Sequence, residues 1–454
     1  MAAASTRNLT LAPHAQWRLR AGRSSSGVIP YVCSLGIAAS LAVAAVYSAI
    51  AVGARLPSGV VPGSRGVVSP GPKLIPRDEV GAAGFGESVA VSADGRTALI
   101  GGGNDDHRRG AVWAFTRQGS LWVQQGKKLV SGEADRDGFG LSVALSGDGN
   151  TALIGEVGDN GRIGAAWVFG RRGSRWTNQG KLVGAGEVGA AEFGYSVALS
   201  ADGNTALIGG PDDDRSQGVV GNLGYGAAWV FTRTGTSWHQ QGEKLTGRGE
   251  TSTGVFGDAV ALASDGNTAL VGAPNADGRG GAWVFTRTHS AWTPQGGKLF
   301  GSGAVGSHVT GFFGAALALS PNGNAALVSG PDDNNMIGAV WAFQRTGASW
   351  KQVGSKLTPR GQHGPAEFGI SLALTAEGEA LIGGWLDQHG RGAAWLFRRS
   401  GSIWRQQGNK ITGQNELGTD SRFGDAVALA AHANTALVGG GGDNHKRGAA
   451  WSFG

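Results

Sequence analysis

The sequence predicts an all-β chain folded as a seven-bladed β-propeller, and three observations lead to this fold class. A consensus phrase, Phe-Gly-x-Ser-Val-Ala-Leu-Ser-x-Asp-Gly-Asn-Thr-Ala-Leu-Ile-Gly-Gly, recurs in seven copies that begin at Phe85, Phe139, Phe193, Phe256, Phe313, Phe368 and Phe423. Successive copies start 54 to 63 residues apart, which suits a four-stranded unit and is too long for a helical repeat. Each copy continues into a second apolar phrase close to Gly-Ala-Ala-Trp-Val-Phe. Repeated four-stranded units of this kind close into a ring of blades.

Each unit supplies four strands, as the third copy illustrates. Two short apolar runs, 195–200 and 205–208, flank Asp202-Gly203, which predicts a type I′ hairpin. The runs 227–231 and 237–241 then flank a second turn at 234–235. The first two strands contain small residues and the later two contain Trp and Phe, as expected for a blade that widens away from the central axis.

The ends of the repeat array predict how the ring closes. The seventh copy stops at Trp451-Ser-Phe-Gly454 and has no fourth strand after it. The missing phrase stands before the first copy instead, where Gly71-Pro-Lys-Leu74 matches Gly126-Lys-Lys-Leu129. We therefore predict that an N-terminal strand completes the last blade, which removes the exposed sheet edges of an open array.

The segment before the repeats predicts export. No charged residue occurs in 28–53, and the apolar run 35–52 is long enough to cross a bilayer. Four arginines, Arg7, Arg18, Arg20 and Arg23, precede it, which favours a cytoplasmic segment 1–27 and repeats outside the cytoplasm. Residues 28–54 are thus interpreted as a transmembrane signal-anchor, 55–72 as a Pro/Gly/Ser linker and 73–454 as the propeller. A cleaved signal peptide after Ala49-Ile-Ala51, giving a secreted protein, is the alternative.

The formal net charge of +6 does not indicate a nucleic-acid partner. Five arginines up to Arg55 have no acidic neighbours in that region, which leaves about +1 for the remainder. The only cysteine, Cys33, lies in the apolar segment, so no disulfide is expected in the repeats.

The repeated Phe-Gly start, followed by Gly-Gly or by Gly272-Ala-Pro274, resembles the FG-GAP repeat of integrin-α-like propellers across 73–454. The phrases Trp-x-Gln-Gln-Gly-x-Lys-Leu and Gly-Ala-Ala-Trp-Val-Phe resemble the bacterial variety of that repeat, which is found in exported proteins. The resemblance implies a seven-bladed propeller with a role in recognition or cell adhesion. Kelch repeats would give the same architecture and are the alternative family, although they lack the repeated Phe-Gly start.

Integrin-type blades often carry an Asp-x-Asp-x-Asp-Gly calcium loop between their first two strands, and this chain departs from that pattern. Here the turn holds one carboxylate at best, as at Asp94 and Asp148. Calcium needs six to eight oxygen ligands, so we expect no calcium at these turns and no required cofactor. Binding of a divalent cation elsewhere in the propeller is left as a possibility.

Acidic residues gather in loops that we expect on one face of the disc, where second strands end and blades connect. The connections between blades include Glu133 and Asp420. A carboxylate ring would attract cations or a cationic partner surface, whereas the alternative is that each Asp caps local backbone N–H groups. The candidate ligand-binding acids are Asp105, Asp159, Asp212, Asp213, Asp214, Asp333, Asp387 and Asp443.

Two further features of these loops suggest sites. An Asp-x-His pattern recurs in units one, six and seven, which are neighbours in a closed ring, and Asp with His could bind zinc or another transition metal. Solvated loop histidines are the alternative. The insertion at 212–225 and Trp385 break the repeat, so a ligand pocket is expected near them. The candidate metal ligands are Asp105, His107, Asp387, His389, Asp443 and His445.

The sequence contains no nucleophile or metalloprotease motif such as Gly-x-Ser-x-Gly or His-Glu-x-x-His, and no phosphate loop. We therefore predict a recognition or adhesion module and not an enzyme. Its expected partners are an extracellular protein or carbohydrate surface, and the membrane through its N-terminal helix. The alternatives are a hydrolase or lyase acting on extracellular polysaccharide at the axial face, and a purely structural envelope protein.

Overall fold

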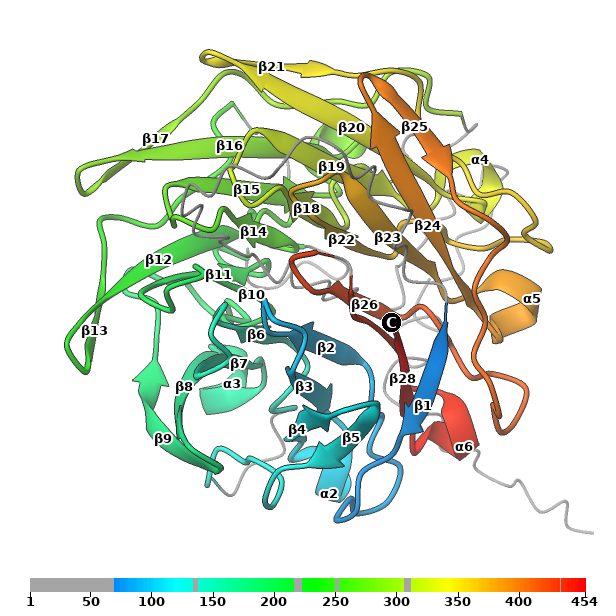
Figure 1. Cartoon of the computed structure of the whole chain (residues 1–454). Coiled ribbons are helices and arrows are strands. Elements are labelled where there is room, and N and C mark those ends of the chain that lie inside the picture. Colours follow the sequence, from blue (N-terminus) through cyan, green and yellow to red (C-terminus); the bar gives the residue numbers. More distant parts are fainter. Residues whose placement is uncertain (1–68, 134–137, 216–222, 250–252, 306–311, 433) are drawn as a thin grey trace, which may run out of the picture. The chain divides into compact units, whose positions relative to one another are not determined.

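The structure, a computed structural model, describes residues 69–133, 138–215, 223–249, 253–305, 312–432 and 434–454. These residues form seven four-stranded antiparallel sheets arranged as the blades of a β-propeller (Figure 1). The predicted all-β, seven-bladed fold is confirmed. The predicted cytoplasmic segment 1–27, the signal-anchor 28–54 and most of the linker lie outside the described residues.

No helix in the described ranges is long and apolar enough to span a membrane.

The first six blades each run from an inner strand to an outer strand in sequence order, and the inner strands of neighbouring blades contact one another around the axis. Blade one contains β2 (Ser88–Val91), β3 (Thr97–Gly102), β4 (Ala111–Gln118) and β5 (Leu121–Gln124). Blade two contains β6 (Val143–Leu145), β7 (Thr151–Glu156), β8 (Ala165–Arg172) and β9 (Arg175–Leu182). Blade three contains β10 (Ser196–Leu199), β11 (Thr205–Gly210), β12 (Ala227–Thr234) and β13 (Ser237–Gln240).

The remaining blades repeat this order. Blade four contains β14 (Val260–Leu262), β15 (Thr268–Ala273), β16 (Gly281–Thr288) and β17 (Ala291–Pro294). Blade five contains β18 (Leu317–Leu319), β19 (Ala325–Gly330), β20 (Ala339–Thr346) and β21 (Ser349–Gln352). Blade six contains β22 (Ser371–Leu374), β23 (Glu379–Gly384), β24 (Ala393–Ser400) and β25 (Ile403–Gln406).

Blade seven closes the ring as the sequence predicts. It combines three C-terminal strands, β26 (Ala426–Leu429), β27 (Ala436–Gly440) and β28 (Ala449–Phe453), with the N-terminal strand β1 (Pro70–Leu74). Strand β1 pairs antiparallel with β28, with Leu74 opposite Ala450. In blade one, Leu129 is opposite Val112 in the same way. Because β1 begins at Pro70, the propeller starts three residues before the predicted boundary at residue 73.

The aromatic residues of the repeat form the packing between its strands. Phe85 is fully buried and meets the Trp113 ring edge-on, with ring centroids 5.3 Å apart. Phe193 meets Trp229 in the same way at 5.2 Å. Edge-to-face aromatic pairs of this kind stabilise a core beyond their burial alone. The Phe of each Phe-Gly start therefore packs against an aromatic ring of the third strand of its blade.

The repeated glycines allow neighbouring blades to approach closely. A side chain at Gly209, on β11, would overlap the carbonyl oxygen of Gly257 in the next blade. Gly257 itself has φ +93°, a conformation that glycine adopts without strain.

The predicted type of the turn between the first two strands is wrong. Among its residues only Gly203 has a positive φ, and Asp202 does not, so the turn is not type I′.

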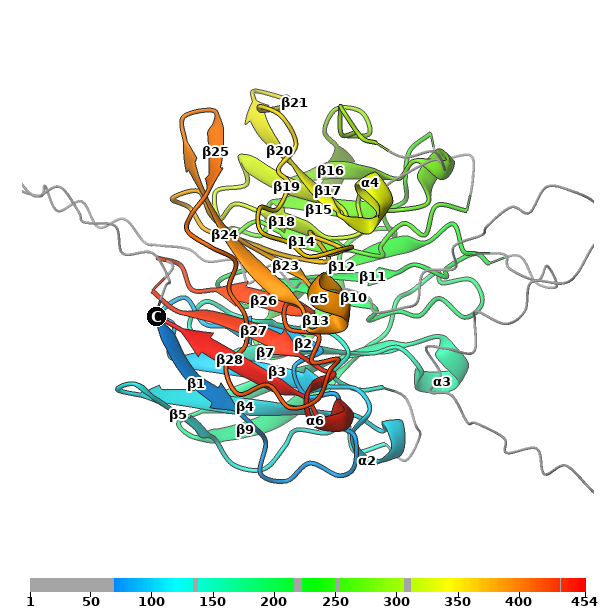
Figure 2. The ribbon, with the colours of Figure 1, turned by 90° about the vertical axis from the view of Figure 1, so that its right-hand side faces the viewer.

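Short helical turns mark the loop face, which we define as the side of the disc where second strands end and blades connect. Figure 2 shows these turns on one side of the propeller. Gly110, at the end of one such loop, bridges to Phe139 at the start of the next blade, so both kinds of loop share this face as predicted. The turns are α2 (Asp105–Arg108), α3 (Asp159–Arg162), η2 (Ala276–Gly278), α4 (Asp333–Met336), α5 (Asp387–Gly390) and α6 (Asp443–Lys446).

Candidate functional site

The repeated Asp of the loop face is part of a buried ion pair in each of six blades. Asp105 illustrates the geometry, because its Oδ1 accepts a hydrogen bond from the Val80 backbone N–H at 2.6 Å. Its Oδ2 accepts a hydrogen bond from the Lys128 ammonium, and the side chain is fully buried. Val80 belongs to the connection that enters the blade, and Lys128 to the segment that leaves it. One carboxylate therefore ties both ends of the blade together.

We call this set the clamp pairs. In four pairs the Lys comes from the Gly-x-Lys-Leu/Ile phrase that follows the fourth strand; in blade two Lys181 lies at the end of the fourth strand β9, and in the last blade the Lys lies on β1. The six pairs are Asp105–Lys128, Asp159–Lys181, Asp213–Lys244, Asp333–Lys356, Asp387–Lys410 and Asp443–Lys73. In blade four, Lys298 pairs with Asp277, whose side chain is 43% exposed.

The clamp pairs change the picture of an exposed acidic ring. In five of them Oδ1 also accepts a backbone N–H, so both carboxylate oxygens have a partner. The six Asp side chains are buried and not exposed. Their pairing is what makes this burial stable, because a buried carboxylate needs a counter-ion and hydrogen bonds. The geometry gives these Asp residues a structural role, and ligand binding by them stays a prediction.

In the third unit, sequence alone left three neighbouring acids as candidates. Asp213 is the clamp residue, with Oδ1 accepting the Val188 N–H at 2.8 Å. Asp212 instead pairs with Arg215 at 2.9 Å. Asp214 is exposed and has φ +56°. The insertion that follows, 216–222, lies outside the described residues.

The Asp-x-His pattern has a backbone explanation. His107, His389 and His445 have φ of 63°, 62° and 58°, and the residue before each is also left-handed. Asn, Asp and His adopt this conformation more readily than most residues, which explains why they recur here. All three histidines are exposed while their Asp partners are buried in clamp pairs. The structure therefore does not direct these residues toward a common ion, and metal binding by them stays a prediction.

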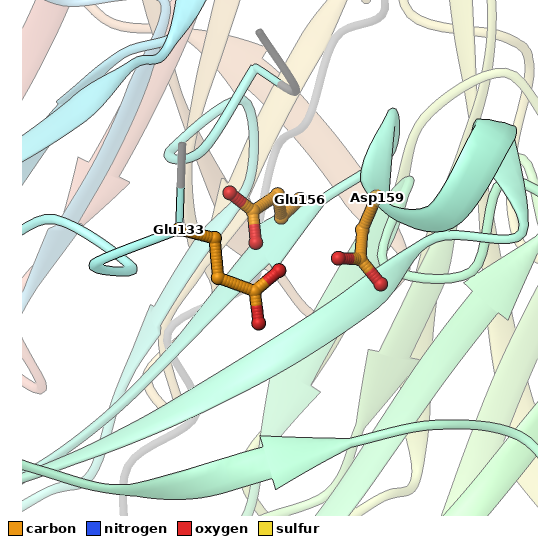
Figure 3. A group of neighbouring side chains, drawn as sticks. All are labelled: Glu133, Glu156 and Asp159. Carbon is orange, nitrogen blue, oxygen red and sulfur yellow. The ribbon is translucent and has the colours of Figure 1, made fainter. Parts of the chain in front are cut away.

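A different acidic group lies close enough to share an ion. Ligand atoms of Glu133, Glu156 and Asp159 come within 4.8 Å of one another in the described part of the chain (Figure 3). The Lys181 ammonium lies 2.6 Å from Asp159 and 3.0 Å from Glu133, and the Trp167 indole N–H donates to Glu156. The Lys181 ammonium thus already pairs with two of the three carboxylates, and the third accepts the indole N–H.

Trp385, predicted to mark a pocket, lies between blades six and seven. Its indole N–H donates to the Glu367 carboxylate at 2.8 Å. The Arg422 guanidinium lies 4.9 Å from the ring centroid, so a cation–π contact covers one face of the indole. The side chain is half-buried and held on two sides.

Three carboxylates lie at the start of inner strands, next to the axis on the loop face. Burial and the nearby Asp425 raise the pKa of Glu87 to about 8. Burial raises the pKa of Asp425 to about 6, and burial together with Asp212 raises the pKa of Asp258 to about 7. Asp258 is hydrogen-bonded to Tyr195. We call Glu87, Asp258 and Asp425 the axial carboxylates.

A family model described as FG-GAP repeat matches residues 122–169 and 176–231. The chain is an FG-GAP repeat β-propeller protein. The matched residues begin in β5, the fourth strand of blade one, and end in β12, the third strand of blade three, and similar phrases recur in the other blades of this FG-GAP propeller. No curated protein matches the chain.

The residues that sequence analysis overlooked are departures from the FG-GAP consensus. Glu156 stands where other units have Gly or Ala at the end of the second strand. The axial carboxylates stand directly after Phe-Gly, where other units have Leu, Tyr, Ala or Ile. A comparison of the seven units, position by position, would have revealed both departures. Their burial and their neighbours could only come from the folded ring.

Proposed function

We propose that this FG-GAP propeller is an exported, membrane-anchored recognition module that binds an extracellular protein or carbohydrate surface through its loop face, without catalysis. One observation carries the proposal. An aliphatic side chain is exposed at the same loop position in four blades. The exposed fractions are 45% for Val80, 51% for Val188, 53% for Val305 and 52% for Leu417.

The clamp pairs explain why these side chains point outward. At each position the backbone N–H donates to the buried clamp carboxylate, as Val305 does to Asp333 at 2.7 Å. The backbone is thereby held from beneath and the side chain is left in solvent. Aliphatic groups on a rigid backbone can contribute buried apolar area to a partner at little cost in conformational entropy. A repeated arrangement of this kind suits an extended macromolecular surface better than a small ligand.

The export and anchoring part of the proposal rests on the sequence of the N-terminal segment. The uncharged segment 28–53 and the arginines before it favour an uncleaved helix with the propeller outside the cytoplasm. The small charge of the remaining chain supports protein or carbohydrate partners and not nucleic acid.

The test compares two sets of substitutions in the full-length protein. The loop-face variant combines Val80→Thr, Val188→Thr, Val305→Thr and Leu417→Asn. The matched control combines Leu121→Asn and Ile403→Thr, two exposed aliphatic residues beside turns on the opposite side of the blades. Binding is measured to surface polysaccharide and to surface protein of the producing organism, each immobilised separately.

We expect the wild type and the control to bind one of the two surfaces, and the loop-face variant to lose at least about tenfold in affinity. Equal binding by all three proteins would contradict the loop-face assignment. Binding to neither surface would contradict the recognition role. Shortening of the polysaccharide on incubation with the wild type would instead support a hydrolase or lyase.

A further inference from the structure

The chain enters the propeller on the side opposite the loop face, which we call the turn face. Strand β1 pairs antiparallel with β28, and its first residue, Pro70, is opposite Phe453, at the end of β28 that is farther from α6. The Gly454 N–H donates to the Ser69 carbonyl at 3.1 Å, which fixes the point of entry beside the C-terminus. Figure 2 shows the C-terminus on the side opposite the helical turns. The segment before residue 69 therefore joins the propeller at the turn face.

Two exposed aliphatic side chains flank this point of entry. Leu121 is 63% exposed and Ile403 is 53% exposed. Each is the first residue of the fourth strand of its blade, in blade one and in blade six, and these two blades are the neighbours of blade seven. The residues at this position in blades two to five are Arg175, Ser237, Ala291 and Ser349. Large aliphatic residues thus occupy this position only on the two blades beside the entering strand, among the six blades whose fourth strand follows the third in the chain.

The turn face is positively charged, although the propeller as a whole is not. Six of the 39 Lys and Arg and none of the 33 Asp and Glu precede residue 69, so the formal net charge of the propeller is zero. The turn face consists of the turns between first and second strands and the hairpin tips, from the last two residues of each third strand to the first residue of the fourth. These segments contain nine arginines and five acidic residues. The positive excess on this face is matched by a negative excess on the rest of the propeller.

Neutral acceptors hold several of these arginines in place and leave their charge available. The Arg117 guanidinium donates to the Thr435 hydroxyl at 2.8 Å, and Arg345 donates to the Asn324 amide oxygen at 2.8 Å. Arg175 on this face and Arg405 beside it are exposed. Guanidinium groups held at the surface of a bilayer are attracted to anionic head groups and can bond their phosphates.

We propose that the turn face docks on the anionic lipid bilayer in which the chain is anchored. Leu121 and Ile403 insert among the head groups, and the arginines bind lipid phosphates. This inference rests on the membrane anchoring proposed above. The loop face then points away from the membrane, toward the protein or carbohydrate surface that it binds.

The length of the tether supports this orientation. Fourteen residues, 55–68, separate the predicted anchor from the described chain. A flexible chain of this length spans roughly 20 Å. Because the tether begins at the turn face, it keeps this face close to the bilayer. Contacts that would be too weak for a free protein are then sufficient, since the effective concentration of the lipid surface is high.

The experiment uses the full-length protein in vesicles of phosphatidylcholine alone or mixed with phosphatidylglycerol, each containing a lipid with a spin-labelled head group. Cys33→Ser removes the native thiol. A fluorophore is attached through Ser402→Cys on the turn face or through Thr419→Cys on the loop face, both at exposed positions. Quenching by the spin label reports which probe lies at the bilayer.

Two sets of substitutions of equal chemistry are compared. The docking variant combines Leu121→Asn, Ile403→Thr, Arg175→Gln and Arg405→Gln. The matched control also replaces two exposed aliphatic residues and two exposed arginines, in loops of the opposite face, by Val130→Thr, Val183→Thr, Arg248→Gln and Arg279→Gln. Because immobilised partners involve no bilayer, the substitutions at Leu121 and Ile403 leave the binding proposed above unchanged.

We expect strong quenching of the Ser402 probe in the mixed vesicles. The Thr419 probe should be quenched little, because strands of up to six residues hold the two faces about 20 Å apart. Quenching at Ser402 should require phosphatidylglycerol and should fall as salt is added. The docking variant should dock at least about tenfold more weakly, since two arginines are lost, and the control should behave as the wild type.

Several results would overturn the inference while leaving the anchor in place. These are equal quenching of the two probes, stronger quenching at Thr419, equal quenching in both kinds of vesicle, and an equal loss in the docking and control variants. Protein that alkaline washing removes from the vesicles would overturn the anchor and this inference together. Washing is scored before fluorescence, so the two failures are distinguishable. The wild-type comparisons decide the question even if a variant fails to fold.

Discussion

The Lys73 ammonium lies 2.7 Å from the Asp443 carboxylate, although the two residues stand near opposite ends of the repeat array. Asp443 is buried and its Oδ1 also accepts the Leu417 N–H at 2.7 Å. The same residue pair occurs within single blades elsewhere, so β1 brings to the last blade both a strand and the cation of its clamp. An ion pair therefore closes the ring together with the backbone pairing of β1 and β28.

Replacing Lys73 by Met should destabilise the propeller by about 3–5 kcal/mol, because removal of one partner leaves a buried carboxylate without its counter-ion. Urea unfolding followed by Trp fluorescence measures the change. Lys298→Met is the matched control, since its partner Asp277 is 43% exposed and solvent screens that pair, so a loss of about 1 kcal/mol or less is expected. Equal losses of unfolding free energy in the two variants would contradict the prediction, because they would show that burial of the Asp443 carboxylate does not increase the cost of removing its lysine.

The axial carboxylates predict an unusual dependence of stability on pH. Burial, with repulsion from Asp425, raises the folded-state pKa of Glu87 to about 8, above its ordinary value of 4.5. The folded chain therefore holds more protons than the unfolded chain between these values, and the free energy of unfolding falls as pH rises from about 5 to 8. The raised pKa values of Asp425 and Asp258 act in the same direction.

Urea titrations in the presence of chelator at pH 5, 6.5 and 8 test this dependence. Glu87→Gln should flatten the slope, because the amide does not titrate, and should be more stable than the wild type at pH 8. A wild type whose stability rises across this range would refute the assignment.

Gly209→Ala should destabilise by about 3 kcal/mol or prevent folding, since its Cβ would overlap the Gly257 carbonyl of the next blade. Gly297→Ala is the control, because no atom lies within 4 Å of its Cβ position and its φ is not left-handed. Differential scanning calorimetry should find the control within about 1 °C of the wild type. A mild effect at Gly209 would mean that the blades separate more easily than their packing indicates.

The left-handed loop residues predict which substitutions the Asp-x-His turns tolerate. His445→Asn should change stability by less than about 0.5 kcal/mol, whereas His445→Val should cost about 1–2 kcal/mol, because a β-branched residue is strained at φ 58°. Thermal melts of both variants measure the difference. Zinc should leave the wild-type melting temperature unchanged; a zinc-dependent rise that the Asn variant loses would restore the metal hypothesis.

Much of the fold could be predicted because it depends on periodicity. A repeat of 54 to 63 residues containing four apolar runs specifies a blade, seven copies specify the ring, and the displaced Gly-Pro-Lys-Leu phrase specifies its closure. The loop chemistry was harder to interpret. Asp105 and Lys128 are both conspicuous in the sequence, yet a polar loop and a lysine normally imply solvent, and only the packing of the connection at Val80 buries them together.

By itself, the sequence determined the local and repeated features of this protein: strand order, blade number, the Phe and Trp core positions and the strand that closes the ring. The first three follow from interactions between residues close in the chain, copied seven times, and the closing strand follows from a phrase of the repeat that stands before the first copy. The tertiary structure alone decided which acids are paired and which are not. Lys73 and Asp443 are more than 300 residues apart and meet only because the N-terminal strand joins the last blade. Burial and electrostatic pairing depend on such distant neighbours, and no local pattern encodes them.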